Sequence, residues 1–165
     1  MTFVPRDRGR EVSALFLEHE PRLFADLAQS EVGGPAAAAP DAAREWQIFA
    51  LYACVRGLVA GGGFNRETAT AIETMHAAVT ERWAQTLPPG ESVDSRRALV
   101  AARYEEYGAI GQAGGKAGAM TVTMRLGKAA ARHMIGAAPS AELAELVGAL
   151  HESLAEAVAA QIRGS

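Results

Sequence analysis

The chain has 165 residues, of which 49% are hydrophobic and 21% are charged, which is the balance of one globular domain long enough to bury about 70% of its unfolded surface. Its formal net charge of −3, without any run of Lys or Arg, argues against a nucleic-acid-binding protein. Its single cysteine, Cys54, excludes an internal disulfide framework and favours the cytoplasm.

The first forty residues predict an arm, a helical segment and a link. Residues 1–7 contain no apolar core segment, so we expect a flexible arm rather than a secretory signal. Residues 8–29 repeat apolar positions every three or four residues, and Pro21 makes them either one kinked helix or two short ones. Residues 31–40 are rich in Gly, Ala and Pro, which predicts a flexible link.

The segment from Ala42 to Gly63 is the element around which we expect the rest of the chain to pack. Asp41 is a suitable N-cap, and a glycine triplet closes the segment. Apolar residues cover every face between them, as in a helix buried in a protein or a membrane. The uninterrupted apolar run covers only residues 48–55, whereas a bilayer requires about 20 mostly apolar residues. Residues 42–60 therefore predict the buried central helix of a bundle.

Two features of this helix have functional interest. Ala53, Gly57 and Gly61 are spaced by four residues, so they share a face that lets another helix approach closely. Arg56 lies on the same face as Tyr52. If Arg56 is buried, its guanidinium needs an acceptor, because an unpaired buried charge is very costly. Arg56 therefore predicts either a structural ion pair or the lining of an anion pocket.

Two more helices are expected after the glycine triplet. Asn65 is a good N-cap for a helix that runs to about Gln85, and the short connection makes it an antiparallel neighbour of the central helix. Ser92 or Asp94 caps the next helix, which runs to about Gln112. Each has an apolar stripe at helical spacing.

A glycine-rich stretch follows and leaves two alternatives. Five glycines lie between Gly108 and Gly118, and each costs a helix about 1 kcal/mol relative to Ala. Either the helix ends near residue 112, or it continues with a kink. We favour a break at Gly114–Gly115, followed by a helix over 117–134 with four apolar residues inside: Met120, Val122, Met124 and Leu126.

Ser140 caps the last predicted helix, which has the clearest amphipathic pattern in the chain. Its apolar stripe consists of Leu143, Leu146, Val147, Leu150, Leu154, Val158 and Ile162. No strand-like alternation occurs elsewhere. The sequence therefore predicts an all-α fold, in which residues 8–165 form a single domain. We expect an orthogonal or up-down bundle of five to seven helices around the central helix at about 42–60.

Glu73 and His76 form the one Glu-x-x-His pair of the sequence, which places both side chains on the same helix face. Di-iron bundles use two such pairs together with further carboxylates, and the sequence offers no second pair. A single metal held by Glu73, His76 and Glu106 is an alternative. The competing interpretation is that His76 lies at the edge of the core and Glu73 is solvated.

Arg103, Glu106 and Tyr107 belong to the densest polar and aromatic group of the chain and point toward roughly one side of a helix. If that side faces Arg56 and Glu73, the result is either a buried polar network that fixes the packing or a ligand pocket. The candidate pocket residues are therefore Tyr52, Arg56, Arg103, Glu106 and Tyr107.

The sequence shows no catalytic constellation. We expect Cys54 to be buried in the most apolar helix and therefore inert, and no Gly-x-Ser-x-Gly elbow occurs. The sequence favours a non-catalytic helical binding or protein-interaction protein, cytoplasmic, homodimeric and without membrane or nucleic-acid binding. Its partner would be a small molecule or another protein. The alternative is a helical-bundle enzyme, or a metal- or small-ligand-binding protein with an interhelical pocket. The sequence indicates no particular cofactor.

Overall fold

The computed structural model of the chain describes residues 4–113 and 119–164. Every regular element in these two ranges is an α-helix, which confirms the predicted all-α domain. In chain order the helices are α1 (Pro5–Gln29), α2 (Gly33–Ala37), α3 (Ala42–Gly62), α4 (Arg66–Ala84), α5 (Val93–Ala113), α6 (Ala119–Ile135) and α7 (Ala141–Arg163). No helix within the described residues combines the length and the apolar character that crossing a membrane requires.

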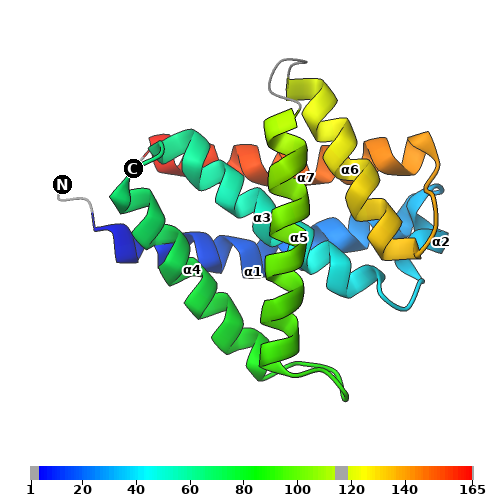
Figure 1. Ribbon diagram of the computed structural model, residues 1–165, viewed down its shortest axis with the longest axis horizontal. Coiled ribbons are helices and arrows are strands. Elements are labelled where there is room, and N and C mark those ends of the chain that lie inside the picture. The colour runs from blue at the N-terminus through cyan, green and yellow to red at the C-terminus, as the bar shows by residue number, and fades with distance from the viewer. Residues whose placement is uncertain (1–3, 114–118, 165) are drawn as a thin grey trace.

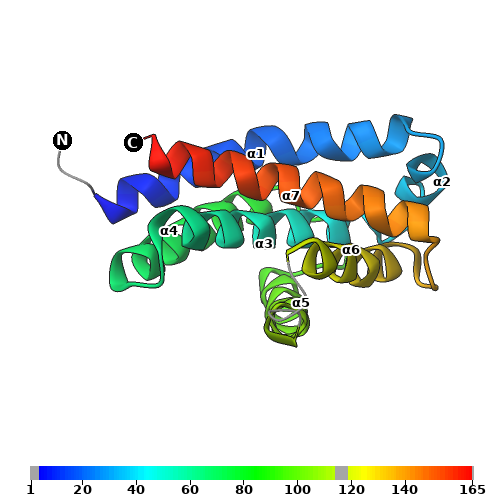
Figure 2. The ribbon, with the colours of Figure 1, turned by 90° about the horizontal axis from the view of Figure 1, so that it is seen from above.

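The bundle is built around α3. This helix packs against α7 and α6, α7 packs along α6, and α4 packs along α1. Figure 1 shows α1 and α7 running along the long axis of the molecule. Figure 2 shows α5 nearly end-on and outside the layers that the other helices form. α5 therefore lies across one face of the bundle, where it meets α3, α4 and α6.

α3 is the buried central helix that the sequence predicts. Side chains on all of its faces are inaccessible to solvent, among them Trp46, Ile48, Phe49, Ala53 and Cys54. The indole N–H of Trp46 donates to the backbone oxygen of Glu20 at 3.1 Å, which ties α3 to α1. A helix surrounded in this way must be apolar all round, because every face contacts another element.

The small residues of α3 allow α7 to approach closely. A Cβ atom on Gly57 would lie 2.6 Å from the carbonyl oxygen of Ala155 and 2.6 Å from the Cβ of Val158. A Cβ on Gly61 would lie 2.8 Å from the Cβ of Ile162. These distances are too short for any side chain, so glycine at both positions sets the separation of the two helices.

The N-terminal elements differ from the sequence prediction. α1 begins at Pro5, within the arm predicted over 1–7, because proline is well suited to the first turn of a helix. α1 is one continuous helix that contains Pro21. Within the link predicted over 31–40, the structure has the short helix α2, where Gly33 is buried and its N–H donates to Ser30 Oγ at 2.8 Å. Packing of α2 against α1 outweighs the low helix propensity of Gly and Pro.

The helix caps mostly follow the sequence. The side chains of Asn65 and Ser140 accept backbone N–H groups at the starts of α4 and α7, as predicted. Ser92, rather than Asp94, caps α5, because its Oγ accepts the N–H three residues on at 3.0 Å. Asp41 makes no side-chain cap at α3, since its backbone is helical (φ −95°, ψ −2°), whereas a capping residue is normally extended.

The helix before the glycine-rich stretch ends close to the predicted position, and the helix after it is more exposed than predicted. α5 continues through Gly108 and Gly111 to Ala113. A Cβ on either glycine would meet no described atom within 4 Å, so neither marks a close helix contact. The predicted break at 114–115 and the side chain of Met120 lie outside the described residues. Met124, predicted to lie inside, is 54% exposed, whereas Leu126 is buried in the core as predicted.

Candidate functional site

A cavity of about 350 Å³ lies between α4 and α5. The two helices are close together at their connecting loop and diverge from it, as Figure 1 shows. Leu51 of α3 also lines the cavity. The lining residues are Leu51, His76, Ala77, Thr80, Trp83, Leu87, Val93, Arg96, Arg97, Val100, Ala101 and Tyr104. We call this cavity the α4–α5 pocket.

The walls of the α4–α5 pocket are mainly apolar. Its polar side chains are those of Thr80, the His76–Tyr104 pair and two neighbouring arginines, Arg96 and Arg97. None of the described residues that line it is Asp or Glu. A concave, mainly apolar site with a few polar groups is the usual form of a small-molecule site in proteins.

His76 and Tyr104 bridge the two helices at one end of the pocket. Nε2 of His76 and the hydroxyl of Tyr104 are 2.8 Å apart, a hydrogen bond. Burial lowers the pKa of His76 and raises that of Tyr104 well above its usual value. Both groups are therefore uncharged near neutral pH, and the pair offers polar contact without a formal charge.

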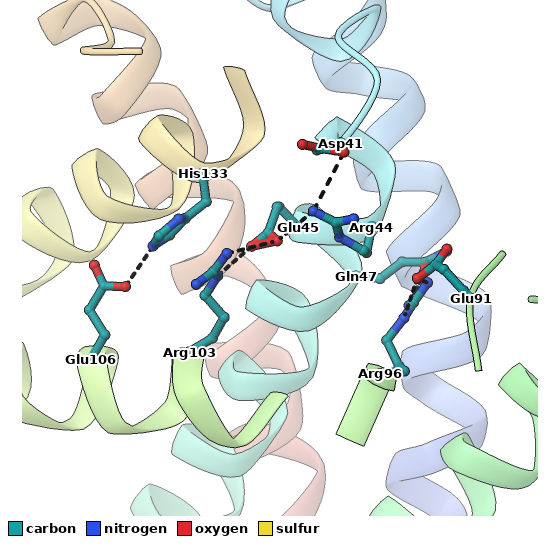
Figure 3. A network of polar contacts seen from close by, with 9 residues as sticks. All are labelled: Asp41, Arg44, Glu45, Gln47, Glu91, Arg96, Arg103, Glu106 and His133. Carbon is teal, nitrogen blue, oxygen red and sulfur yellow. Dashed lines mark hydrogen bonds and ion pairs between the residues drawn. The ribbon is translucent and has the colours of Figure 1, made fainter. Parts of the chain in front are cut away.

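Arg96 is buried at the opposite end of the pocket, and its charge is fully paired. Its Nε and Nη2 donate to Glu91 Oε1 at 3.2 and 3.0 Å, and its Nη1 donates to Gln47 Oε1 at 2.9 Å. Figure 3 shows the guanidinium between these two acceptors. The guanidinium also lies 4.8 Å from the centre of the Trp83 ring, a cation–π contact. Arg96 therefore fixes the position of Trp83 in the pocket wall.

Arg103 anchors α5 to α3 outside the pocket. Its Nε donates to Glu45 Oε1 at 2.6 Å and its Nη2 to Glu45 Oε2 at 3.3 Å, as Figure 3 shows. The Glu45 side chain is completely buried, and Arg44 also lies 3.4 Å from it. Burial acts to lower the pKa of Arg103, but the hydrogen bond and the negative charge of Glu45 raise it overall. This geometry is that of a structural ion pair.

Glu106 and Tyr107 hold α5 in place further along. Glu106 Oε2 lies 2.6 Å from His133 Nε2 on α6, which links those two helices (Figure 3). Tyr107 is buried, with its ring centre 5.2 Å from that of Phe49 and 5.5 Å from that of Tyr52. These contacts fix the packing of α5 against α3 and α6.

Arg56 lies at another place in the bundle. Its Nη1 donates to Glu152 Oε2 on α7 at 2.9 Å, and the hydroxyl of Thr123 donates to the same oxygen at 3.1 Å. The structure therefore contains the ion pair that was one of the two roles predicted for Arg56, and Arg56 and Arg163 also line a small cavity of about 200 Å³ between α3 and α7. The structure does not bring the five candidate pocket residues together into one cavity, and none of them lines the α4–α5 pocket.

The Glu73–His76 pair gains no further metal ligand in the structure. Glu73 is exposed, His76 bonds to Tyr104, and Glu106 bonds to His133 instead. Among the described residues, no three His, Cys, Asp or Glu side chains gather as a metal site would require. His76 instead has a place in the wall of the α4–α5 pocket.

Sequence reasoning missed most of the residues that line this pocket. Val93, Arg97, Val100, Ala101 and Tyr104 recur at helical spacing along α5 and share one side, so the stripe itself could have been found. The sequence could not reveal that α4 and α5 diverge and leave part of this stripe uncovered. That depends on the crossing of the helices.

Comparisons with known proteins supply no site by analogy. No protein-family model, curated protein or solved structure gives a significant match to the chain.

Proposed function

We propose that the protein is a non-catalytic binding protein for a small, mainly apolar molecule, which occupies the α4–α5 pocket. The observation that supports this most directly is the cavity itself, of about 350 Å³ with mostly apolar walls. Small-molecule sites in proteins typically measure about 300–1,000 Å³ and contain a few well-placed polar groups. This proposal gives a location to the binding role predicted from the sequence.

The pocket offers different contacts along its length. Leu51, Trp83 and Val100 provide apolar surface for the body of a ligand. The bridge between His76 and Tyr104 provides an uncharged hydrogen-bonding group at one end. Removing apolar ligand surface from water supplies most of the binding free energy in such a site, and the polar groups fix the orientation.

Binding is a better interpretation of this site than catalysis. Cys54, the one cysteine of the chain, is buried in α3, and burial raises the pKa of its thiol. A thiol in such surroundings is a poor nucleophile. His76 and Tyr104 are both uncharged near neutral pH, and their mutual hydrogen bond satisfies the imidazole nitrogen that faces the phenol. The helical-bundle enzyme remains the alternative, and turnover of any substrate in this pocket would establish it.

Filling the pocket tests the proposal. Ala101 lines the pocket and is itself exposed, so Ala101→Phe adds a ring inside the cavity without crowding the core. Ala102 is also exposed but does not line the pocket, so Ala102→Phe is the matched control. We expect anilinonaphthalene sulfonate to bind the wild type and Ala102→Phe saturably, and Ala101→Phe at least about tenfold more weakly. Fluorescence titration measures this, and near-ultraviolet circular dichroism checks the fold.

Equal binding of the probe to Ala101→Phe and wild type would place its site elsewhere and reject the proposal. The homodimer expected from the sequence is a separate prediction, which sedimentation velocity can test. Phe64, between α3 and α4, is 94% exposed and is the first residue to replace there. Loss of a dimer in Phe64→Ser would assign the interface to that corner.

A further inference from the structure

We infer that the ligand of the α4–α5 pocket is a small amphipathic monoanion, whose carboxylate meets Arg97 and whose alkyl or aromatic body lies in the cavity. This inference rests on the proposed function and specifies its ligand class. The charges around the cavity are all positive among the described residues that line it. Two arginines line it, and none of its described lining residues is acidic.

The two arginines differ in how their charges are balanced. Arg96 is 5% exposed and donates three hydrogen bonds, two to Glu91 and one to Gln47. Its charge is thus neutralised by a carboxylate within the fold. A ligand anion at Arg96 would have to compete with Glu91, so Arg96 is a positioning residue that holds Trp83.

Arg97 is the charge that the fold leaves unbalanced. It follows Arg96 on α5, lines the pocket and is exposed. It makes no ion pair with any residue that the structure describes. A guanidinium binds a carboxylate through two parallel hydrogen bonds, and an exposed position at the wall of the cavity lets the carboxylate stay partly hydrated.

The rest of the pocket excludes other placements of a charge. The opposite end carries only the uncharged His76–Tyr104 bridge, and a buried charge there would lose its hydration without an opposite charge to replace it. A cationic ligand would meet the positive charge of Arg97 without an acidic residue in the pocket lining. A ligand with an apolar body against Trp83 and Val100 and an anionic group toward Arg97 avoids both a buried unpaired charge and repulsion by Arg97.

Three probes that share one alkyl chain separate charge from apolar contact: octanoate, octanol and octylamine. We expect isothermal titration calorimetry on the wild type to rank octanoate about tenfold tighter than octanol, with octylamine the weakest. In Arg97→Gln, octanoate should fall to the affinity of octanol, whose own affinity stays unchanged. The preference should also weaken at high salt, because Arg97 is exposed.

Arg82→Gln is the matched control, because Arg82 is an exposed arginine of α4 outside the pocket lining. It makes the same change of net charge and should leave all three affinities as in the wild type. Equal binding of octanoate and octanol, or equal losses in both arginine variants, would overturn the inference. The proposed function would survive that result if Ala101→Phe still weakened the binding of anilinonaphthalene sulfonate at least about tenfold. If none of the probes binds the wild type, or Ala101→Phe has no effect, the proposed function fails as well.

Discussion

Glu20 is a carboxylate that the fold buries in α1, where it is only 7% exposed. Burial raises the pKa of its carboxyl to about 7, although a hydrogen bond with the Gln47 side chain acts to lower it. An unfolded glutamate releases its proton near pH 4.5. Between pH 4.5 and 7 the folded state therefore binds more protons than the unfolded state. The free energy of unfolding consequently falls as the pH rises through that window.

Replacing Glu20 with Gln removes this pH dependence while preserving size and hydrogen bonding. We expect Glu20→Gln to be more stable than the wild type by about 1–3 kcal/mol at pH 7.5, and the difference to vanish near pH 4. Urea denaturation at both pH values measures it. Glu11 is an exposed glutamate of the same helix, and Glu11→Gln should change stability by less than about 0.5 kcal/mol. Identical behaviour of the two variants would show that Glu20 ionises normally.

Several residue-scale features follow from local sequence, and others do not. Asn65 and Ser140 cap their helices because capping needs only the side chain and the next turn. His151 lies four residues after Val147 on the apolar stripe of α7, so its complete burial can also be predicted from the sequence. The partner of Arg103, by contrast, is Glu45, 58 positions earlier in the chain. Such a pairing depends on how α5 crosses α3, which no local pattern encodes.

At the scale of the elements, glycine has opposite consequences in different helices. A Cβ on Gly57 would lie 2.6 Å from the backbone of α7, whereas a Cβ on Gly108 of α5 would meet no described atom within 4 Å. Alanine is intrinsically the better helix former by about 1 kcal/mol. Only the contact with a neighbouring helix can reverse that preference.

The same substitution at the two sites should therefore change stability in opposite directions. We expect Gly57→Ala to destabilise the protein by about 1–3 kcal/mol, since α3 and α7 must move apart. Gly108→Ala should stabilise it by about 0.5–1 kcal/mol. Chemical denaturation at one pH measures both. A stabilising Gly57→Ala would mean that α7 does not pack against this face of α3.

Element positions were more predictable than their arrangement. The central helix at 42–60 could be recognised because α3 is apolar on every face, and α7 because its stripe is regular. α2 could not be predicted, because Gly and Pro form helix there only through packing against α1. The α4–α5 pocket escaped prediction for a related reason. It exists only because two helices joined by a short loop diverge, and their own sequences do not set that angle.

At the scale of the whole molecule, the helices are held in two different ways. α3 and α7 touch through their backbones at Gly57 and Gly61. α5 has only two buried residues among those described, Arg96 and Tyr107, and is tied to its neighbours by side-chain bonds such as Arg103 to Glu45. α5 is also the helix that forms one wall of the pocket.

This difference should appear as two rates of amide hydrogen exchange. Local opening costs least where few apolar side chains are buried, so amides of α5 should exchange with deuterium well before those of α3 and α7. Mass spectrometry of peptides from a labelling time course measures this. Saturating octanoate should slow exchange in 93–113 and leave 42–62 unchanged. Uniform exchange across the helices would mean that α5 opens only with the entire protein.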